Sequence, residues 1–325
     1  MHIRLLDANS LGYVHHHGQP HLAAPSGEPV QAVTGVLAAA RHKLERTPDI
    51  LNVWIWDGRA QWRYDLHPLY KSGRRRTPEQ RQDRQDYRWQ QPWIQKALRC
   101  LPVLQLTHPG AEADDVAWGL ARQLSKQGHL VTLETVDADW LQGVTGRVRW
   151  QNARSPHQLV ELEGFLATSG GYLSPATVGH TKALTGDASD DIEGVEGIAL
   201  KRAFGLLSKY KTLEALLAAT EDFATFSQEP SYAHALMTPE IQTLVRRNLA
   251  LIDISRGPVL KGEGCVLDVG GWDDLDFYEV ALDLGLEHWK NQISGWRRVG
   301  ERALESGPIQ VVKRALASLE QSWGP

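Results

Sequence analysis

The sequence has little cysteine, no long apolar run and no low-complexity stretch, and each shortage excludes a class of protein. Only Cys100 and Cys265 occur among 325 residues, which excludes a disulfide scaffold and fits a reducing compartment. No apolar run approaches the roughly 18 residues of a membrane helix, and the first ten residues lack the apolar core of a secretory signal. We therefore expect a cytoplasmic protein with no membrane partner.

Several common catalytic signatures are missing too. The sequence contains no Gly-rich phosphate loop, no Gly-x-Ser-x-Gly elbow and no His-Glu-x-x-His motif. His15, His16 and His17 are consecutive, and consecutive residues do not share a face, so we expect an exposed polar loop there rather than a metal site. The length predicts about two domains, and a 42% hydrophobic content is enough for a sizeable core.

Charge is unevenly distributed along the chain. The net charge of −4 argues by itself against a nucleic-acid binder. Between Arg59 and Arg99, however, eleven basic residues accompany only four acidic ones, which gives this segment a charge of +7. A basic segment in a chain that groups its acids elsewhere suits both a phosphate substrate and divalent cations.

The N-terminal half alternates short runs of branched or aromatic residues with helical patterns. We predict strands at 3–8, 50–56, 103–107, 131–136 and 147–151, and helices at 30–46, 78–98 and 114–127. This alternation predicts an α/β fold with a mostly parallel, doubly wound sheet. Beyond about Gly170 the strand signals fade, and we predict a helical second domain with helices at 175–184, 199–210, 212–218, 239–252, 277–284 and 311–322.

Acidic residues recur where the predicted strands end. They are Asp7 and Asp57 after the first two strands, Asp137 and Asp139 after the fourth, and Glu112, Asp114 and Asp115 at the start of the helix after the third. Because the carboxyl ends of parallel strands meet at one sheet edge, we expect these seven to converge. Such crowding needs compensation, and all-oxygen ligands suit Mg²⁺ or Mn²⁺. Two ions about 3.5–4 Å apart suit phosphodiester hydrolysis.

Each of these features also has a purely structural interpretation. An acid at a helix start is often a cap, and an Asp before Gly is often a turn, so only the recurrence at successive strand ends favours a site. Gly194-Val-Glu-Gly197 is either a simple turn or a loop whose backbone N–H groups meet a phosphate at a helix N-terminus.

Seven motifs in a fixed order, from about residue 3 to about residue 255, resemble the 5′-nuclease family. They are Asp7; Asp57-Gly; Tyr70-Lys71-x-x-Arg74; Glu112-Ala-Asp-Asp115; Asp137-x-Asp139; Leu184-Thr-Gly-Asp-x-Ser-Asp190; and Gly194-Val-x-Gly-Ile198. The family includes bacteriophage 5′→3′ exonucleases, flap endonucleases and the 5′-nuclease domain of bacterial DNA polymerase I. The resemblance implies a PIN-like sheet with a helical arch, followed by a helical domain with a helix–three-turn–helix element.

The resemblance also implies residue roles. The first metal would be held by Asp7, Asp57, Glu112, Asp114 and Asp115, and the second by Asp137, Asp139, Asp187 and Asp190, with Asp114 bridging. Tyr70, Lys71 and Arg74 would lie at the arch base, where Lys71 and Arg74 contact the scissile phosphate. The implied DNA-binding residues are Arg75, Arg76, Arg81 and Arg84 in the arch, and Gly194, Gly197 and Lys201 in the helix–three-turn–helix element, where the family often holds K⁺.

The sequence departs from the family pattern at three places. Asp191 stands where Asn is common, and it either binds metal indirectly or caps a turn. Ala199 replaces a usual third Gly, and Tyr13-Val14-His15 replaces a segment that often carries Arg. Residues after about 262 resemble nothing in the family.

From the resemblance we expect a two-metal 5′→3′ exonuclease or flap endonuclease, of phage type, that acts in replication or repair and releases 5′-phosphate products. It would be a monomer acting on 5′ ends, 5′ flaps and duplex junctions of DNA, with RNA–DNA hybrids as a further substrate, in a bacterial or phage-infected cytoplasm. The expected domains are 1–170 with the arch at about 62–99, 171–290, and a helical extension at 291–325. Two rival interpretations are a structure-specific DNA-binding module without catalysis and a PIN-domain ribonuclease.

Overall fold

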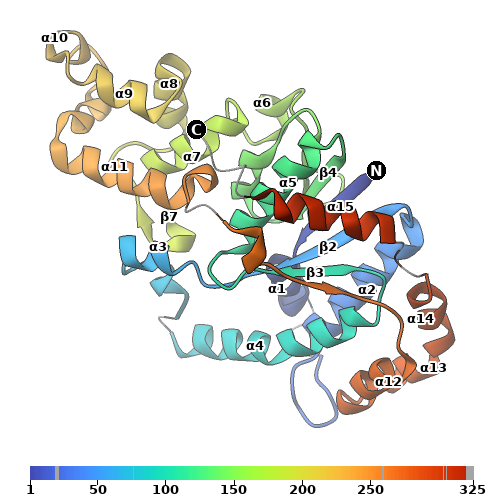
Figure 1. Cartoon of the computed structure of the whole chain (residues 1–325). Coiled ribbons are helices and arrows are strands. Elements are labelled where there is room, and N and C mark those ends of the chain that lie inside the picture. Colours follow the sequence, from blue (N-terminus) through green and yellow to red (C-terminus); the bar gives the residue numbers. More distant parts are fainter. Residues whose placement is uncertain (19–21, 76, 258–259, 303, 305, 320–325) are drawn as a thin grey trace.

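A mixed seven-stranded sheet forms the centre of the molecule in the computed structural model, which describes residues 1–18, 22–75, 77–257, 260–302, 304 and 306–319 (Figure 1). The strand order is β6-β5-β4-β1-β2-β3-β9. The strands are β1 (His2–Asp7), β2 (Ile50–Trp56), β3 (Leu104–Thr107), β4 (Leu130–Thr135), β5 (Val148–Asn152), β6 (Leu159–Val160) and β9 (Val266–Val269). The inner five run parallel, and only the edge strands β6 and β9 are antiparallel. The predicted mostly parallel α/β fold is confirmed.

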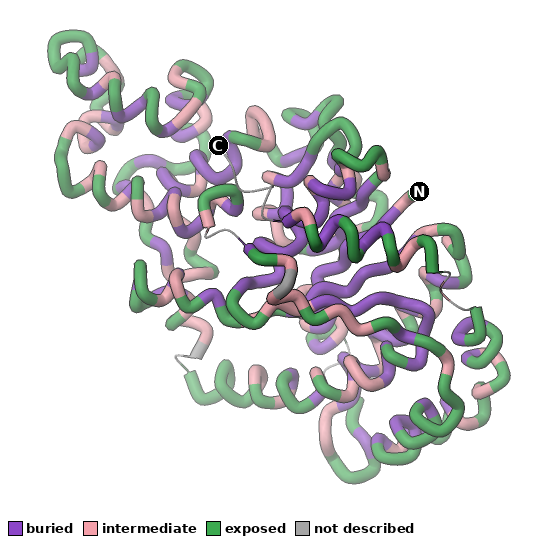
Figure 2. Tube along the Cα trace, viewed as in Figure 1, coloured by how far each residue is buried: buried purple, intermediate pink, exposed green. Residues whose placement is uncertain are grey.

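The sheet is buried on both faces, as its continuous apolar strands require (Figure 2). Ile3 and Leu5 of β1 pack on one face with α5 (Ala113–Lys126) and α15 (Ser306–Ala317). Leu6 points to the other face, as the two-residue period of a strand demands, and packs with α1 (Ala8–Gly18), α2 (Gln31–Arg46) and α4 (Pro78–Arg99). Helices therefore cover the sheet on both of its faces.

The histidine run was wrongly expected to be an exposed loop. His15, His16 and His17 form the last turn of α1, and His16 is buried between α1, α2 and α4. Its burial is tolerated because the ring nitrogens contact Gln31, Gln90 and Asp83. The helix was not predicted from the sequence because Ala8–Gly18 is polar for a buried helix.

The arch region follows β2. It comprises α3 (Gln61–Leu66), the 3₁₀ turn η1 (Ser72–Arg75) and the 22-residue helix α4. A capping box between Thr77 and Gln80 starts α4, and only its inner face is buried, so its outer half lies along the edge of the molecule (Figure 1).

The predicted helical second domain is also present. Its elements are α7 (Pro175–Thr185), the hairpin β7 (Gly186–Asp187) and β8 (Ile192–Glu193) with the 3₁₀ turn η3 (Ala188–Asp190) between them, α8 (Leu200–Tyr210), α9 (Leu213–Ala219), α10 (Phe223–Phe226) and α11 (Pro239–Ile252). The short helix α6 (Phe165–Thr168) precedes it. Leu184, Leu207 and Leu249 contribute to a core of its own.

The described residues after 257, which are 260–302, 304 and 306–319, pack on the first domain. Strand β9 pairs with β3, and α12 (Asp274–Asp283), α13 (Glu287–Asn291) and α14 (Ile293–Gly300) join the core beneath α2 and α4. The domain bounds expected from the sequence stay a prediction, but this packing groups residues 266–290 with the sheet rather than with α7–α11. Among the described helices, none combines the length and apolarity needed to cross a membrane.

Gly58, directly after β2, allows two loops to touch. A Cβ there would lie 1.9 Å from the carbonyl oxygen of His108 and 2.8 Å from that of Ala111. Both are backbone atoms, so the loop before α5 would have to move. We expect Gly58→Ala to lower the free energy of unfolding by about 1–3 kcal/mol in urea denaturation. Gly146→Ala, where a Cβ meets nothing within 4 Å, is the control; equal stability of the two variants would contradict the close contact.

Candidate metal centre and nucleic-acid interface

Carboxylates from neighbouring strand ends meet above the sheet, as expected. Asp7 accepts hydrogen bonds from Ser10 N (2.9 Å) and Thr135 Oγ1 (2.8 Å), which orient it at the junction of β1 and β4. Asp57 accepts from Asn9 Nδ2 and Ala113 N, both at 2.8 Å, which joins the end of β2 to the start of α5. The parallel strands therefore bring acids that are distant in sequence to one edge.

The acids on α5 and after β4 complete this group. Asp114, in the first turn of α5, accepts from Trp140 Nε1 at 2.9 Å. Asp137 caps the 3₁₀ turn η2 (Ala138–Gly143) by accepting from Asp139 N at 2.8 Å. Asp137 and Asp139, which both follow β4, are therefore held in one turn.

Burial, together with neighbouring carboxylates, raises the pKa values of several of these acids, whereas the pKa of Glu112 lies below its ordinary value because Lys71 and Arg63 face it. Burial, helped by the charges of Asp57 and Asp137, raises the pKa of Asp7 to about 7. Burial also raises the pKa of Asp139 to about 7, although Lys182 opposes the shift. The pKa of Asp114 lies well above its ordinary value for the same reason, with Asp137 and Glu112 adding to it. The raised values indicate that nearby basic side chains do not fully balance the negative charge of the centre.

Three basic side chains partly compensate. Lys182 of α7 bridges Asp139 (2.5 Å) and Asp187 (2.8 Å), which ties the second domain to the sheet edge. Lys71 Nζ lies 2.8 Å from Glu112 Oε1 and 3.8 Å from Asp190 Oδ2, and Arg74 pairs with Asp190. Burial alone would lower the pKa of Lys71, but the charges of Glu112 and Asp190 raise it above its ordinary value. All three stay cationic.

Asp115 pairs with a different cation, Arg63. Its two oxygens accept from Arg63 Nη1 and Nη2, both at 2.7 Å, and one also accepts from the backbone N of Glu112. Both side chains are almost fully buried. Glu112 accepts from the Tyr70 hydroxyl at 2.9 Å, so Tyr70 orients a carboxylate. Metal ligation by Asp115 and by the other eight acids stays a prediction.

The donor chemistry fits hard divalent cations. The acids offer only oxygen, and their mutual repulsion has no full compensation among the described residues. No three of these acids, all of which the structure describes, have oxygens that all lie within 4.8 Å of one another. In the described part of the chain, only His16, His17 and Asp83 form a group of three ligand atoms that meets this distance. Mg²⁺ keeps several waters and needs few direct carboxylates, so spaced acids suit it.

A cavity of about 260 Å³ lies between the carboxylates and the arch. Asp57, Glu112, Lys71, Arg74 and Arg84 are among the residues that line it. Arg81 is exposed on α4, whereas Arg76 and the side chain of Arg75 lie outside the described residues. The basic arch and the acidic centre therefore share one opening.

The loop before α8 has the expected glycine geometry. Gly197 has φ +80°, and a Cβ on Gly194 would lie 2.2 Å from the Thr185 carbonyl oxygen. Arg202 Nη1 donates to the Gly197 carbonyl and its guanidinium lies 4.8 Å from the centre of the Tyr232 ring. Lys201 is exposed beside it. This arrangement presents basic groups next to a tight backbone turn.

Asp191 has a structural partner. It adopts φ +57°, and its carboxylate accepts from the backbone N of Gly73 at the arch base. The turn-capping interpretation of this residue therefore has a contact to support it, while indirect metal binding stays untested.

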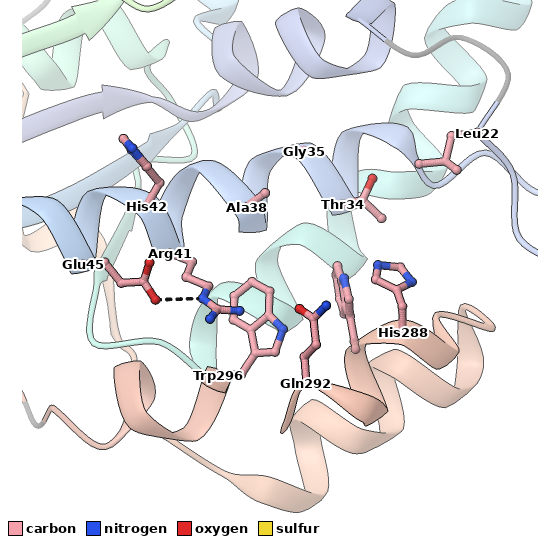
Figure 3. A pocket seen from close by; sticks show the side chains of 11 residues that line it. Leu22, Thr34, Gly35, Ala38, Arg41, His42, Glu45, His288, Gln292 and Trp296 are labelled. Carbon is pink, nitrogen blue, oxygen red and sulfur yellow. Dashed lines mark hydrogen bonds and ion pairs between the residues drawn. The ribbon is translucent and has the colours of Figure 1, made fainter. Parts of the chain in front are cut away.

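A larger hollow lies elsewhere, between α2 and helices α13 and α14 (Figure 3). This cavity of about 480 Å³ contains none of the clustered carboxylates. Arg41 lies 4.9 Å above the Trp296 ring and bonds Glu45 at 3.0 Å, so its charge is already engaged. We assign it no catalytic role.

Sequence reasoning missed Arg63, Lys182, Asn9 and Thr135. Arg63 and Lys182 could be suspected only as counter-ions that a buried acid must have. Asn9 and Thr135 carry no spacing signal of their own, but each lies within two residues of a strand-end acid.

Comparison with known proteins identifies related chains. Residues 2–169 match the family model of the 5′-3′ exonuclease N-terminal resolvase-like domain, and residues 173–257 match that of the 5′-3′ exonuclease C-terminal SAM fold. Thermostable DNA polymerase I of Thermus aquaticus is 33% identical over 238 residues, covering 71% of this chain and 27% of that protein. DNA polymerase I of Chloroflexus aurantiacus is 34% identical over 234 residues, covering 69% and 24%. The chain thus spans about a quarter of these polymerases.

Solved structures share the fold. The 5′-exonuclease of bacteriophage T5 with bound zinc has a TM-score of 0.64 at 20% identity, covering 88% of this chain and 99% of that one. The catalytic core of Rad2 in complex with DNA has a TM-score of 0.53 at 14% identity, covering 90% and 91%.

The raised carboxyl pKa values predict a pH dependence of stability. Asp7 and Asp139 ionise near pH 7 in the folded, metal-free chain but near their ordinary value of 3.8 when unfolded. The folded state therefore binds more protons between these limits, and its stability falls as the pH rises from about 4 to about 7. Each group contributes up to about 1.4 kcal/mol per pH unit.

Histidines whose pKa is lowered by burial, such as His2, His15 and His180, titrate in the same range and act in the opposite direction. The test is therefore a difference. In EDTA, the free energy of urea unfolding of the wild-type chain should decrease relative to that of Asp139→Asn between pH 5 and pH 7, because the variant lacks one titrating group, and Mg²⁺ should reduce this difference. Parallel pH profiles of the two proteins would contradict the electrostatic account.

Proposed function

Because the chain belongs to the 5′-3′ exonuclease family, we propose that it is a metal-dependent 5′→3′ exonuclease and flap endonuclease. It would hydrolyse phosphodiesters at 5′ ends, 5′ flaps and duplex junctions of DNA, and of RNA–DNA hybrids, and release 5′-phosphate products in replication or repair. The observation that carries this proposal is that Asp57 and Glu112, two acids of the strand-end cluster, line the same cavity as Lys71, Arg74 and Arg84 of the arch.

Two divalent ions, Mg²⁺ with Mn²⁺ as substitute, fit the oxygen-only donor set. Asp7, Asp57, Glu112 and Asp114 would hold one, and Asp137, Asp139, Asp187 and Asp190 the other. Because Asp115 is committed to Arg63, we infer that it acts by fixing the start of α5. The bound cations would supply the Lewis acidity that stabilises charge on the reacting phosphate.

The chain's own cations would then act on the substrate. Lys71 and Arg74 now neutralise Glu112 and Asp190, and cations at the centre would free them to bind the scissile phosphate. There they would stabilise charge that develops in the transition state, while Tyr70 keeps Glu112 in place.

DNA would be held by backbone contacts on both sides of the centre. Arg84, with Arg75, Arg76 and Arg81, would guide a single-stranded 5′ end beneath the arch. Gly194, Gly197 and Lys201 would contact the duplex phosphates. A K⁺ ion at this loop is part of the proposal, although Arg202 already donates to the Gly197 carbonyl. We further propose that the enzyme is a monomer of phage type and acts in the bacterial or infected-cell cytoplasm.

The first experiment uses 5′-labelled flap duplex, blunt duplex and single-stranded DNA, each with Mg²⁺ or EDTA. Mg²⁺-dependent cutting at the flap junction, or stepwise loss from 5′ ends, is expected. Tight flap binding without cutting would instead favour a binding module, and cutting of single-stranded RNA alone a PIN-type ribonuclease.

Asp139→Asn should abolish cleavage and spare binding. The substitution keeps the shape of the side chain but removes a charge shared with Lys182. Single-turnover cleavage and flap affinity in Ca²⁺ provide the two measurements. The control is Asp49→Asn, an exposed acid away from the cluster. Retained Mg²⁺-dependent activity would remove Asp139 from the proposed metal set.

Lys71→Met should slow single-turnover cleavage by about 10²–10³-fold, as expected for loss of one preorganised donor. Affinity for the flap should change far less, because many other basic groups contact the phosphates. Lys126→Met, an exposed lysine on α5, serves as the matched control. An unchanged rate constant would refute a transition-state role.

A further inference from the structure

The arch helix α4 is fastened to the body along one face. Gln90 Oε1 accepts from Ala32 N at 2.7 Å, and the Tyr87 hydroxyl donates to Asn9 Oδ1 at 3.2 Å. One turn further out, Asp83 contacts His16 and His17 of α1. These positions follow the helical period, so Asp83 is the outermost of three successive contacts.

The outermost contact has metal-ligand chemistry. His16 Nε2 lies 3.1 Å and His17 Nδ1 3.6 Å from the same oxygen, Asp83 Oδ1, and all three atoms lie within 4.8 Å of one another. Tetrahedral Zn²⁺ with bonds of about 2.0–2.1 Å separates its ligands by about 3.3 Å. The two separations from Asp83 are therefore already close to the spacing that an ion needs, and a water would fill the fourth position.

We propose that His16, His17 and Asp83 bind one transition-metal ion of the Zn²⁺ class, which clamps the outer half of α4 to α1. This site is chemically distinct from the carboxylate centre, because imidazole nitrogen selects Zn²⁺ whereas carboxylate oxygen suits Mg²⁺. It lies at the last turn of α1, whereas Asp7 directly precedes the first turn, and it does not depend on the proposed nuclease activity.

A buried glutamine supports metal binding at His16. Gln31 is 5% exposed, and its Nε2 lies 3.1 Å from His16 Nδ1, while its Oε1 has no hydrogen-bond partner among the described residues. When Nε2 of the imidazole binds a metal, Nδ1 carries the proton and needs an acceptor. Rotating the Gln31 amide places Oε1 there and satisfies it.

Gln90 limits this rearrangement. Its Oε1 is held by the backbone of Ala32, so its Nε2 must keep facing His16 Nδ1. On metal binding, Gln90 Nε2 would give up that contact but keep its bond to the Asp86 carbonyl at 3.2 Å. The ion therefore has to displace two hydrogen bonds, this one and the direct contact between His16 Nε2 and Asp83 Oδ1 at 3.1 Å.

The test uses Co²⁺ as a spectroscopic stand-in for Zn²⁺, with the full chain in excess Mg²⁺. One Co²⁺ per chain with the intense visible absorption of tetrahedral nitrogen ligation is expected. His17→Ala and Asp83→Asn should lose both, and both fold readily to judge from side chains that are 53% and 37% exposed. Asp86→Asn on the same helix is the matched control, and Asp139→Asn should retain the site.

Three results would overturn the proposal. They are the absence of Co²⁺ absorption in the wild-type chain, an unchanged spectrum and stoichiometry in His17→Ala, and loss of the site in Asp139→Asn, which would place the ion in the carboxylate centre. Gln31→Ala should keep one ion but weaken its binding by about 10–100-fold, as for other residues that orient a ligand; an unchanged affinity would remove the role of Gln31.

The clamp itself has a separate readout. Zn²⁺ should slow tryptic cleavage after Arg81 and Arg84 in the wild-type chain by at least tenfold and have no effect on Asp83→Asn. Equal protection in both proteins would exclude a clamp at this position. None of these measurements involves DNA cleavage, so failure here and failure of the proposed nuclease activity are distinguishable.

Discussion

Negative charge concentrated at one sheet edge is the constraint on which the rest of the structure depends. Asp7, Asp114 and Asp139 are buried beside other carboxylates, so their pKa values rise. A fold does not keep such repulsion for stability, since each carboxyl would be less costly as an amide. The cluster is explained when cations complete it, and the surrounding protein supplies partial substitutes, Lys71 and Lys182, from the arch base and from the second domain. The arch base and the second domain are thus attracted to the same charge.

The buried pair of Arg63 and Asp115 gives this centre its rigidity. Arg63 binds both oxygens of Asp115 and also donates to the Leu251 carbonyl, so α3, α5 and α11 are joined at one guanidinium. Breaking a buried pair by removing one partner typically costs about 3–5 kcal/mol. The position of Asp115 suggests a metal ligand, but its contacts with Arg63 make it an anchor of α5, the helix that carries Asp114.

The sequence was sufficient for the elements whose pattern is local. All five predicted strands and the helix on Asp114 agree with the structure to within a residue or two, because short β-branched runs and a 3.6-residue apolar period are local signals. The convergence of the acids also followed from parallel topology alone. Helix α1 and strand β9 were missed: α1 is polar and is stabilised by tertiary hydrogen bonds, and β9 exists only because β3 offers an edge. Counter-ions such as Lys182 could not be found, because pairing across 43 residues has no sequence period.

The arch and the histidine cluster show why a local pattern can conceal a site. Consecutive histidines on a helix point about 100° apart, which argues against shared ligation while the helix is considered alone. At the last turn of α1 the two rings instead approach one carboxylate on another helix, so the partner rather than the spacing creates the geometry. The same reasoning applies to the carboxylates, whose meaning comes from the strand ends that gather them. In both places an element distant in the sequence determines which chemistry the local residues can perform.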